Sequence, residues 1–226
     1  MRQFIALIAL LAPPATAALA GPPDDFQYRS RLDLRWLDTT NWVATTWGEM
    51  RWTHDASRFT NWRVSQSLQY NPSPALTFGV GYTFIEQDGF DSIAQSDAFR
   101  DTHRAEFDVI PRFQLADDLR LNWRVRFENR WIDGRGGWNP QFRTKPELVF
   151  ALHGAGPLAE VFASDEIFYD LKQDLFAENR FIPAGLSWSL GRHARLRIYY
   201  LLDSVNGANG WVNLHVLQTQ LTLSLR

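Results

Sequence analysis

Polar and apolar residues alternate along the segment from residue 119 to residue 127. Its odd positions carry Leu, Trp, Val and Phe side chains, whereas its even positions carry Arg or Asn. Successive side chains of a β-strand point to opposite faces, so this strand has one apolar face and one cationic face. The two-faced pattern recurs about ten times, which is typical of a barrel with lipid outside and polar groups inside.

The first twenty residues have the features of an export signal. Arg2 precedes a short apolar stretch, and the small residues Ala18 to Ala20 fit a signal-peptidase site before Gly21. We therefore predict a cleaved signal peptide at residues 1–20 and a single outer-membrane β-barrel domain at residues 21–226.

The composition excludes several classes of protein. The formal charge of -2 becomes -3 without Arg2, an imbalance too small to indicate nucleic acid as a partner. The chain has no cysteine, so disulfides cannot stabilise it. After residue 20 no apolar run reaches the length of roughly eighteen residues that a transmembrane helix needs, so any membrane crossing has to use strands.

Eleven segments come close to the roughly nine to eleven residues of a tilted membrane-spanning strand. Because bacterial single-chain barrels have an even number of strands, we predict an all-β, antiparallel transmembrane barrel of about 10–12 strands, with twelve favoured and ten next. The segments are 26–36, 42–52, 60–70, 75–85, 102–113, 118–131, 143–152, 158–168, 178–190, 194–203 and 212–225.

The connections and the aromatic residues support an outer-membrane barrel. Short turn-forming links alternate with longer polar stretches at residues 86–101, 132–142, 170–177 and 203–211, which we expect to be extracellular loops. Many of the ten tryptophans flank these connections, as in interfacial aromatic girdles. The alternative is a soluble β-sandwich or lipocalin-like barrel with its apolar face inside, which the strand count and the unequal loops disfavour.

Several short motifs, taken in order and spacing, resemble the bacterial family known as domain of unknown function 2490. The resemblance implies a small outer-membrane barrel, and the family has no established activity to carry over. The motifs are Glu49-Met50-Arg51, Gly79-Val80-Gly81-Tyr82, His103-Arg104, Arg124-Val125-Arg126, Glu128-Asn129-Arg130, Glu160, Glu166-Ile167-Phe168, Glu178-Asn179-Arg180 and Asn213-Leu214-His215.

The candidate functional residues are charged side chains on the predicted inner faces. Arginine outnumbers lysine twenty-one to two, and arginine pairs bidentately with carboxylates in confined sites. Such a lumen is either filled with ion pairs or partly open as an anion-selective passage or ligand site. We predict a lumen charge network of Arg29, Arg31, Arg35, Glu49, Arg51, Arg104, Glu106, Arg124, Arg126, Glu128, Arg130, Glu160, Glu166, Arg195 and Arg197, with Asp33, Arg63, Asp108, Arg112 and Glu147 also inward.

Catalytic patterns are weak. His103, His153, His193 and His215 could face Ser164, Ser187 or Ser224, but no pair is placed by its spacing. The chain has neither a metal-binding spacing of histidines nor a glycine-rich phosphate loop, so no catalytic, cofactor or metal residue is predicted.

The expected role is therefore not enzymatic. We expect a narrow pore or ligand-binding barrel in the cell outer membrane. Its partners would be outer-membrane lipid, lipopolysaccharide and the barrel-assembly machinery, and its oligomeric state is left open. A structural envelope protein and a membrane-embedded lipid or lipopolysaccharide hydrolase are the alternatives.

Overall fold

A computed structural model describes residues 25–91, 96–134, 137–207 and 210–225, and side chains between residues 89 and 99 are left out of the description. The signal peptide predicted at residues 1–20 lies outside the described residues. Within the described part, no helix has the length and apolar character that a membrane crossing requires.

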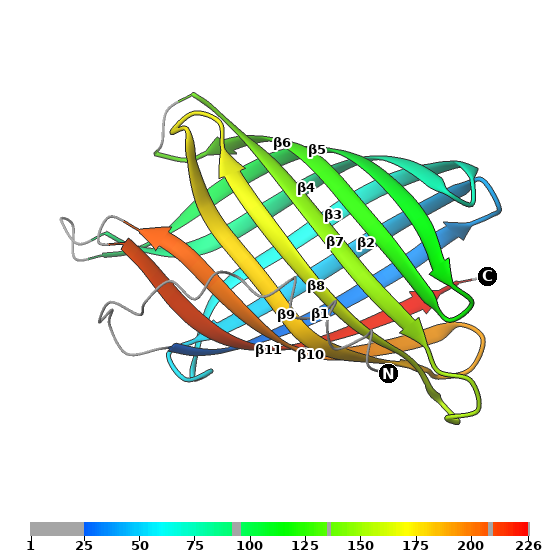
Figure 1. The fold of residues 1–226 in the computed structure, drawn as a ribbon. Helices are drawn as coiled ribbons and strands as arrows, with labels where there is room; N and C mark the ends of the chain where they lie inside the picture. The colour runs from blue at the N-terminus through cyan, green and yellow to red at the C-terminus, as the bar shows by residue number, and fades with distance from the viewer. Residues whose placement is uncertain (1–24, 92–95, 135–136, 208–209, 226) are drawn as a thin grey trace.

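The described residues form eleven β-strands that close into one barrel, so the prediction of an all-β barrel is confirmed (Figure 1). Each strand pairs with its neighbours in the sequence. The strands are β1 (Asp25–Asp38), β2 (Trp42–Thr53), β3 (Arg58–Ser73), β4 (Leu76–Asp91), β5 (Ser96–Ala116), β6 (Leu119–Ile132), β7 (Trp138–Ala151), β8 (Leu158–Asp170), β9 (Leu175–Ser189), β10 (Ala194–Gly207) and β11 (Gly210–Ser224).

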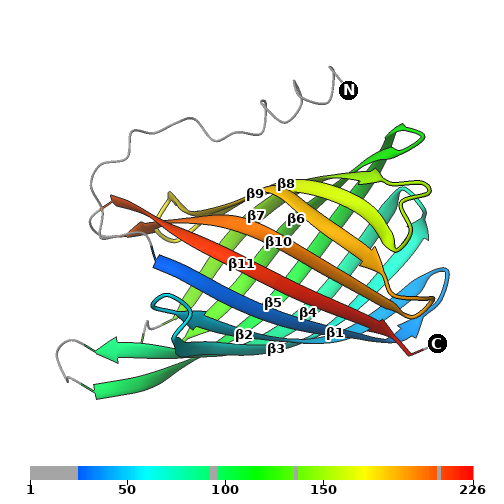
Figure 2. The same ribbon diagram turned by 90° about the horizontal axis from the view of Figure 1, so that it is seen from below.

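The barrel closes through a parallel pair, β1 with β11 (Figure 2). The register of this seam runs from Asp25 opposite Leu214 to Arg35 opposite Ser224. All the other pairs are antiparallel, and with eleven strands the first and the last must run in the same direction. The favoured count of twelve strands was wrong, because a parallel pair removes both sheet edges as completely as an antiparallel one.

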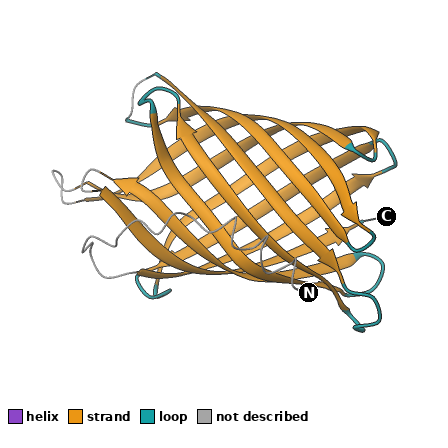
Figure 3. Cartoon of the chain, viewed as in Figure 1, coloured by secondary structure: helices purple, strands orange, loops and turns teal. Residues whose placement is uncertain are grey.

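The strands continue well beyond the segments expected from alternation (Figure 3). β4 and β5 remain paired from Glu86 opposite Asp101 to Asp91 opposite Ser96, in a stretch predicted to be an extracellular loop. About half or more of each long loop predicted at residues 132–142, 170–177 and 203–211 is likewise strand. Backbone pairing does not need an apolar outer face, so these polar hairpins carry no alternation by which the sequence could reveal them.

The two faces of the barrel wall differ sharply in polarity. Among the described residues, twenty-eight large apolar side chains are exposed, whereas the buried side chains include twenty-one polar or charged ones and ten apolar ones. Trp123 is 43% exposed, while Glu128 is completely buried. The prediction of a polar, arginine-rich lumen is thus confirmed, and the apolar surface lies outside, opposite to the arrangement in a soluble barrel.

The parallel seam can be tested by disulfide trapping. Leu32 lies opposite Leu221 in the β1–β11 register, so L32C combined with L221C should cross-link under mild oxidation and shift the gel mobility of the unfolded chain. The control pair, L32C with L217C, is offset by four residues or roughly 13 Å along the strand, and should not cross-link. Equal cross-linking of both pairs, or of neither, would contradict the seam.

Candidate functional site

The inward-facing side chains surround two cavities that follow each other along the lumen. The larger has a volume of about 640 Å³ and extends to Asp88, Arg100 and Val205 near the end of the barrel where β4 joins β5. The smaller, of about 240 Å³, lies on the side of Asn122 and Gln220. We call the larger cavity the chamber.

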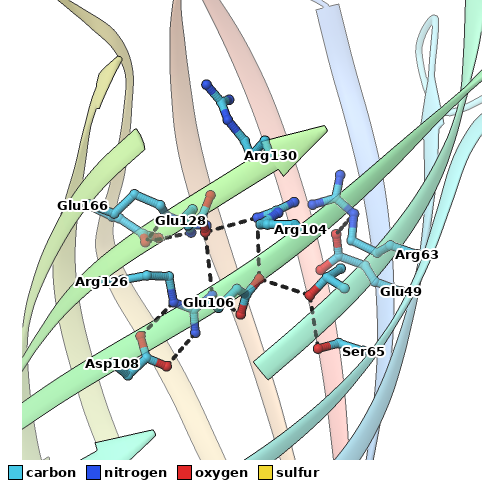
Figure 4. Close-up of polar contacts among 12 residues, drawn as sticks. Glu49, Arg63, Ser65, Arg104, Glu106, Asp108, Arg126, Glu128, Arg130 and Glu166 are labelled. Atoms are coloured by element: carbon cyan, nitrogen blue, oxygen red, sulfur yellow. Dashed lines mark hydrogen bonds and ion pairs between the residues drawn. The ribbon is translucent and has the colours of Figure 1, made fainter. Parts of the chain in front are cut away.

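A network of charged side chains with alternating sign crosses one wall of the chamber, and Figure 4 shows its first part. Asp108 accepts two hydrogen bonds from Arg126, at 2.6 Å from Nε and 2.7 Å from Nη2. Nη1 of Arg126 also lies 2.6 Å from Oε2 of Glu106. Nη1 of Arg104 is 3.7 Å from Glu106 and donates to Glu128 at 3.1 Å.

The network continues from Glu128 across β7 and β8. Glu128 also accepts a hydrogen bond from Arg143, whose Nη2 donates to Oε1 of Glu166 at 2.6 Å. Arg124 donates to the same oxygen at 2.5 Å. Four arginines and four carboxylates therefore neutralise each other in formal charge. In order along the network they are Asp108, Arg126, Glu106, Arg104, Glu128, Arg143, Glu166 and Arg124.

The strand register explains why loss of one charged side chain from this network should destabilise the barrel. Glu106 lies directly opposite Glu128 in the β5–β6 pair, and Arg126 directly opposite Arg143 in the β6–β7 pair. Like charges placed opposite each other destabilise a sheet. Each such pair is tolerated because side chains of the opposite charge bridge it, as Arg104 and Arg126 do for Glu106 and Glu128.

A second group of charges lies beside the parallel seam. Arg29 is almost completely buried and donates to Asp203 at 2.5 Å, and Arg180 lies 3.5 Å from the same carboxylate. Nε of Arg51 donates to Glu49 at 2.7 Å, while Nε of Arg63 is 3.6 Å from Glu49. The first set of contacts joins β1 and β9 to β10, and the second joins β2 to β3.

The remaining predicted residues lie farther along the lumen or at its rims. Arg31 pairs with Asp33 at 2.7 Å, Arg197 with Glu147 at 3.1 Å, and Arg130 with Asp170 at 2.9 Å. Glu160 is contacted by Arg195 at 3.4 Å and by Arg120 at 2.7 Å. Arg35 is exposed and Arg112 is half-buried towards the rim opposite the chamber, where Arg35 lies 3.7 Å from Asp38 and Arg112 donates to the carbonyl oxygen of Pro74.

Five side chains contribute to both cavities and so form the layer between them. They come from strands on different sides of the barrel and are cationic, aromatic or aliphatic. We call this layer the septum. Its members are Arg31 from β1, Arg124 from β6, Lys145 from β7, Ile182 from β9 and Tyr199 from β10.

Phe162 fills the lumen directly below the septum. It is 2% exposed, and its ring lies edge-on to Tyr199 with 5.6 Å between ring centroids. The guanidinium of Arg197 lies 3.6 Å from the centre of its ring, in a cation–π contact. Gly185 makes room for this ring, because a Cβ at that position would be 2.2 Å from Cζ of Phe162.

Sequence reasoning missed several charged residues of the lumen. Arg143, Lys145 and Arg180 all line the chamber but were not predicted to point inward. Arg143 and Lys145 lie four and two residues before Glu147, which was predicted to point inward. Extending the alternation of side chains along β7 would therefore have placed both of them inward as well. Asp203 was assigned to the edge of a loop, although it ends the predicted strand 194–203 and alternates in step with Arg195 and Arg197, so the same extension would have placed it inward.

The histidines and the lumen serines lie on opposite faces of the wall. His103 and His215 face outward, where Tyr82 and Tyr200 contact their Nδ1 atoms. Ser164 and Ser187 are completely buried on the inner side. Among the described residues, no three His, Asp or Glu side chains are arranged so that they could hold a metal ion.

The fold and the lumen together define a β-barrel with an apolar outer surface and a charged interior divided by a septum. A comparison with known families identifies the family of the chain. Residues 35–213 match the family described as "Protein of unknown function (DUF2490)", so the chain belongs to that family, as the motifs predicted. No curated protein matches the sequence.

Removal of Arg126 should test the role of the charge network. R126A leaves Glu106 facing Glu128 without one of their bridging cations, so we expect the free energy of unfolding to fall by roughly 3–5 kcal/mol. The measurement is urea-induced unfolding of the refolded barrel. R192A, in the exposed turn between β9 and β10, is the control and should change stability by less than about 0.5 kcal/mol.

A second variant separates charge compensation from simple loss of packing. R126A takes a cation away from Asp108, Glu106 and Glu128, and adding E106Q removes one of these three negative charges, so the double variant should regain part of the lost stability. If R126A were as stable as the wild type, the network would not be holding the wall together.

Proposed function

We propose that this chain is an outer-membrane β-barrel whose lumen is closed at the septum and whose chamber binds an anionic ligand from one end. The chamber carries this proposal, because it has a volume suited to a small molecule and more cationic than anionic side chains around it. A structural role of the charge network in holding the barrel together is compatible with this function.

The outer surface supports a location in a membrane. Apolar side chains cover the outside of the strands, and exposed tryptophans lie towards both ends, with Trp36 and Trp42 at one and Trp131 and Trp138 at the other. This distribution fits an apolar band flanked by aromatic girdles. Together with the export signal predicted at residues 1–20, it favours the outer membrane, with lipid and lipopolysaccharide around the barrel and insertion by the barrel-assembly machinery.

The charges around the chamber favour an anion. Its lining contains twelve Arg or Lys residues and six Asp or Glu residues, an excess of six cations. Carboxylates behind the lining reduce this excess, since the lumen ion pairs join fourteen cations to eleven carboxylates. A positive balance remains, and the arginines also have more donors than the carboxylates can accept.

The septum favours a binding chamber over an open pore. Arg31, Arg124 and Lys145 are each paired with a carboxylate, and Tyr199 packs on Phe162. A conducting path would require these groups to leave their partners. His103 and His215 face outward and His153 and His193 lie in turns between strands, away from the buried lumen serines, which disfavours the hydrolase alternative.

The membrane location can be tested by fractionation of cell envelopes. We expect the chain in the outer-membrane fraction, resistant to carbonate extraction and with a gel mobility that changes on heating, because a closed barrel resists unfolding by detergent until heated. An unrelated periplasmic protein and a known outer-membrane barrel serve as fraction markers. Recovery with the periplasmic marker would refute the membrane part of the proposal.

The closed septum can be tested in planar bilayers. The wild-type barrel should show no conductance steps, whereas the double variant I182A/Y199A should open an anion-selective path, because both truncations remove side chains of the septum. I198A, on the outer face of β10, is the matched control and should stay closed. Wild-type conductance that the septum variant leaves unchanged would show that ions pass by another route.

A further inference from the structure

The wall of the chamber has two chemically different sides. Strands β2 to β7 contribute most of its arginines, including Arg51, Arg63 and Arg104. Strands β9 to β11 contribute an apolar patch of Ile182, Leu201 and Leu214, with the charged residues Glu178, Arg180 and Asp203 beside it. A simple inorganic anion would contact only the arginine-rich side. The apolar side therefore indicates what else the ligand contains.

Some guanidinium nitrogens on the cationic side have no hydrogen-bond acceptor among the described residues. Arg51 donates through Nε to Glu49, and neither of its terminal nitrogens has a partner among the described residues. Arg63 directs Nε and Nη2 to Oδ1 of Asn61 at 3.3 and 3.2 Å, which leaves Nη1 without a partner among those residues. Two guanidinium groups that share Glu49 are thus available to a phosphate or carboxylate in the chamber.

The apolar side is a packed, continuous surface. Leu201, Ile182 and Val216 belong to one buried cluster, and Leu214 packs against it. Leu201 lies opposite Val216 in the β10–β11 register, and Leu201, Ile182 and Leu214 also line the chamber. Leu201 and Ile182 are only 3% and 4% exposed, so they form a dry apolar stretch of the chamber wall against which an apolar group of a ligand would be shielded from water.

The two sides are close neighbours around the barrel. Only β1 separates β2 from β11, and its Arg29 lies opposite Arg51 on one side and opposite Gln218 on the other. Gln218 is two residues from Val216, on the same face of β11. A ligand a few carbon atoms long would therefore contact both sides.

We infer that the chamber takes an amphipathic anion, with its phosphate or carboxylate head on Arg51 and Arg63 and its apolar body against Leu201, Ile182 and Leu214. This inference rests on the proposed function and makes it more specific. The volume of about 640 Å³ accommodates a small amphiphile but not a whole phospholipid with two long acyl chains.

The test compares probes that share a head or a tail. Octyl phosphate, inorganic phosphate and octyltrimethylammonium are titrated calorimetrically into the complete barrel in lipid nanodiscs, and empty discs correct for partition into lipid. Octyl phosphate should bind roughly tenfold or more tightly than inorganic phosphate, because several methylene groups become buried. Octyltrimethylammonium, which has the tail but the opposite charge, should not bind.

Two pairs of variants locate the head and the tail. V205T, a nearly isosteric change at the chamber wall, and L201S should both weaken octyl phosphate several-fold and leave inorganic phosphate unchanged. L202S, on the outer face beside Leu201, is the control and should bind like the wild type. R63Q should weaken both phosphates, whereas M50Q, on the outer face of β2, should weaken neither.

The outcomes separate this inference from the proposed function. Equal affinity for octyl phosphate and inorganic phosphate would overturn the amphipathic ligand and leave an anion-binding chamber. Binding of neither phosphate, or equal binding of octyltrimethylammonium, would overturn both.

The source of the ligand is tested by measuring the affinity for octyl phosphate in discs of different lipid composition. Competition by discs that contain lysophosphatidylglycerol, an anionic lipid with a single acyl chain, would assign the bound amphiphile to the membrane, and unchanged affinity in those discs would assign it to the surrounding water. The amphipathic anion is supported in either case.

Discussion

The structure depends on compensation of charge inside a closed wall. Once apolar side chains occupy the outer face of each strand, the period of two places most of the charged side chains inside, and the interior must then neutralise its own charges. The eight-membered network from Asp108 to Arg124 does this by alternating sign across four strands. The like charges that face each other in the ladder show that no single strand pair is balanced alone.

This compensation also explains why the lumen is divided. Arginine side chains are long, and those of Arg31 and Arg124 reach from the wall to carboxylates while contributing to both cavities. Phe162 occupies the space below them because Gly185 has no side chain to oppose it. The free volume is consequently gathered into a chamber near one end and does not form a uniform channel.

Much of the architecture could be predicted because alternation is a local property. The pattern from residue 119 to residue 127 revealed the inward direction of Arg124 and Arg126, and similar patterns located all eleven strands. The strand number was nevertheless misjudged, since the direction of the closing pair depends on residues nearly two hundred positions apart and leaves no local trace.

The candidate site was harder to predict than the fold. The alternation of side chains along each strand predicted that many arginines point inward. The carboxylate that each arginine contacts depends instead on the stagger between strands. Arg29 and Asp203 are 174 residues apart, and neither position shows that the other is its partner. The apolar side of the chamber was also hidden, because inward leucines such as Leu201 look in sequence like ordinary members of an apolar run.

The odd number of strands has a consequence for the two ends of the chain. In a barrel with an even number, the first strand starts at the same end at which the last one stops. Here β1 starts at the chamber end and β11 stops at the other end, because the two run in parallel. If the barrel spans a membrane, tags attached before Asp25 and after Leu225 would lie in different compartments, with the first beside the mouth of the chamber.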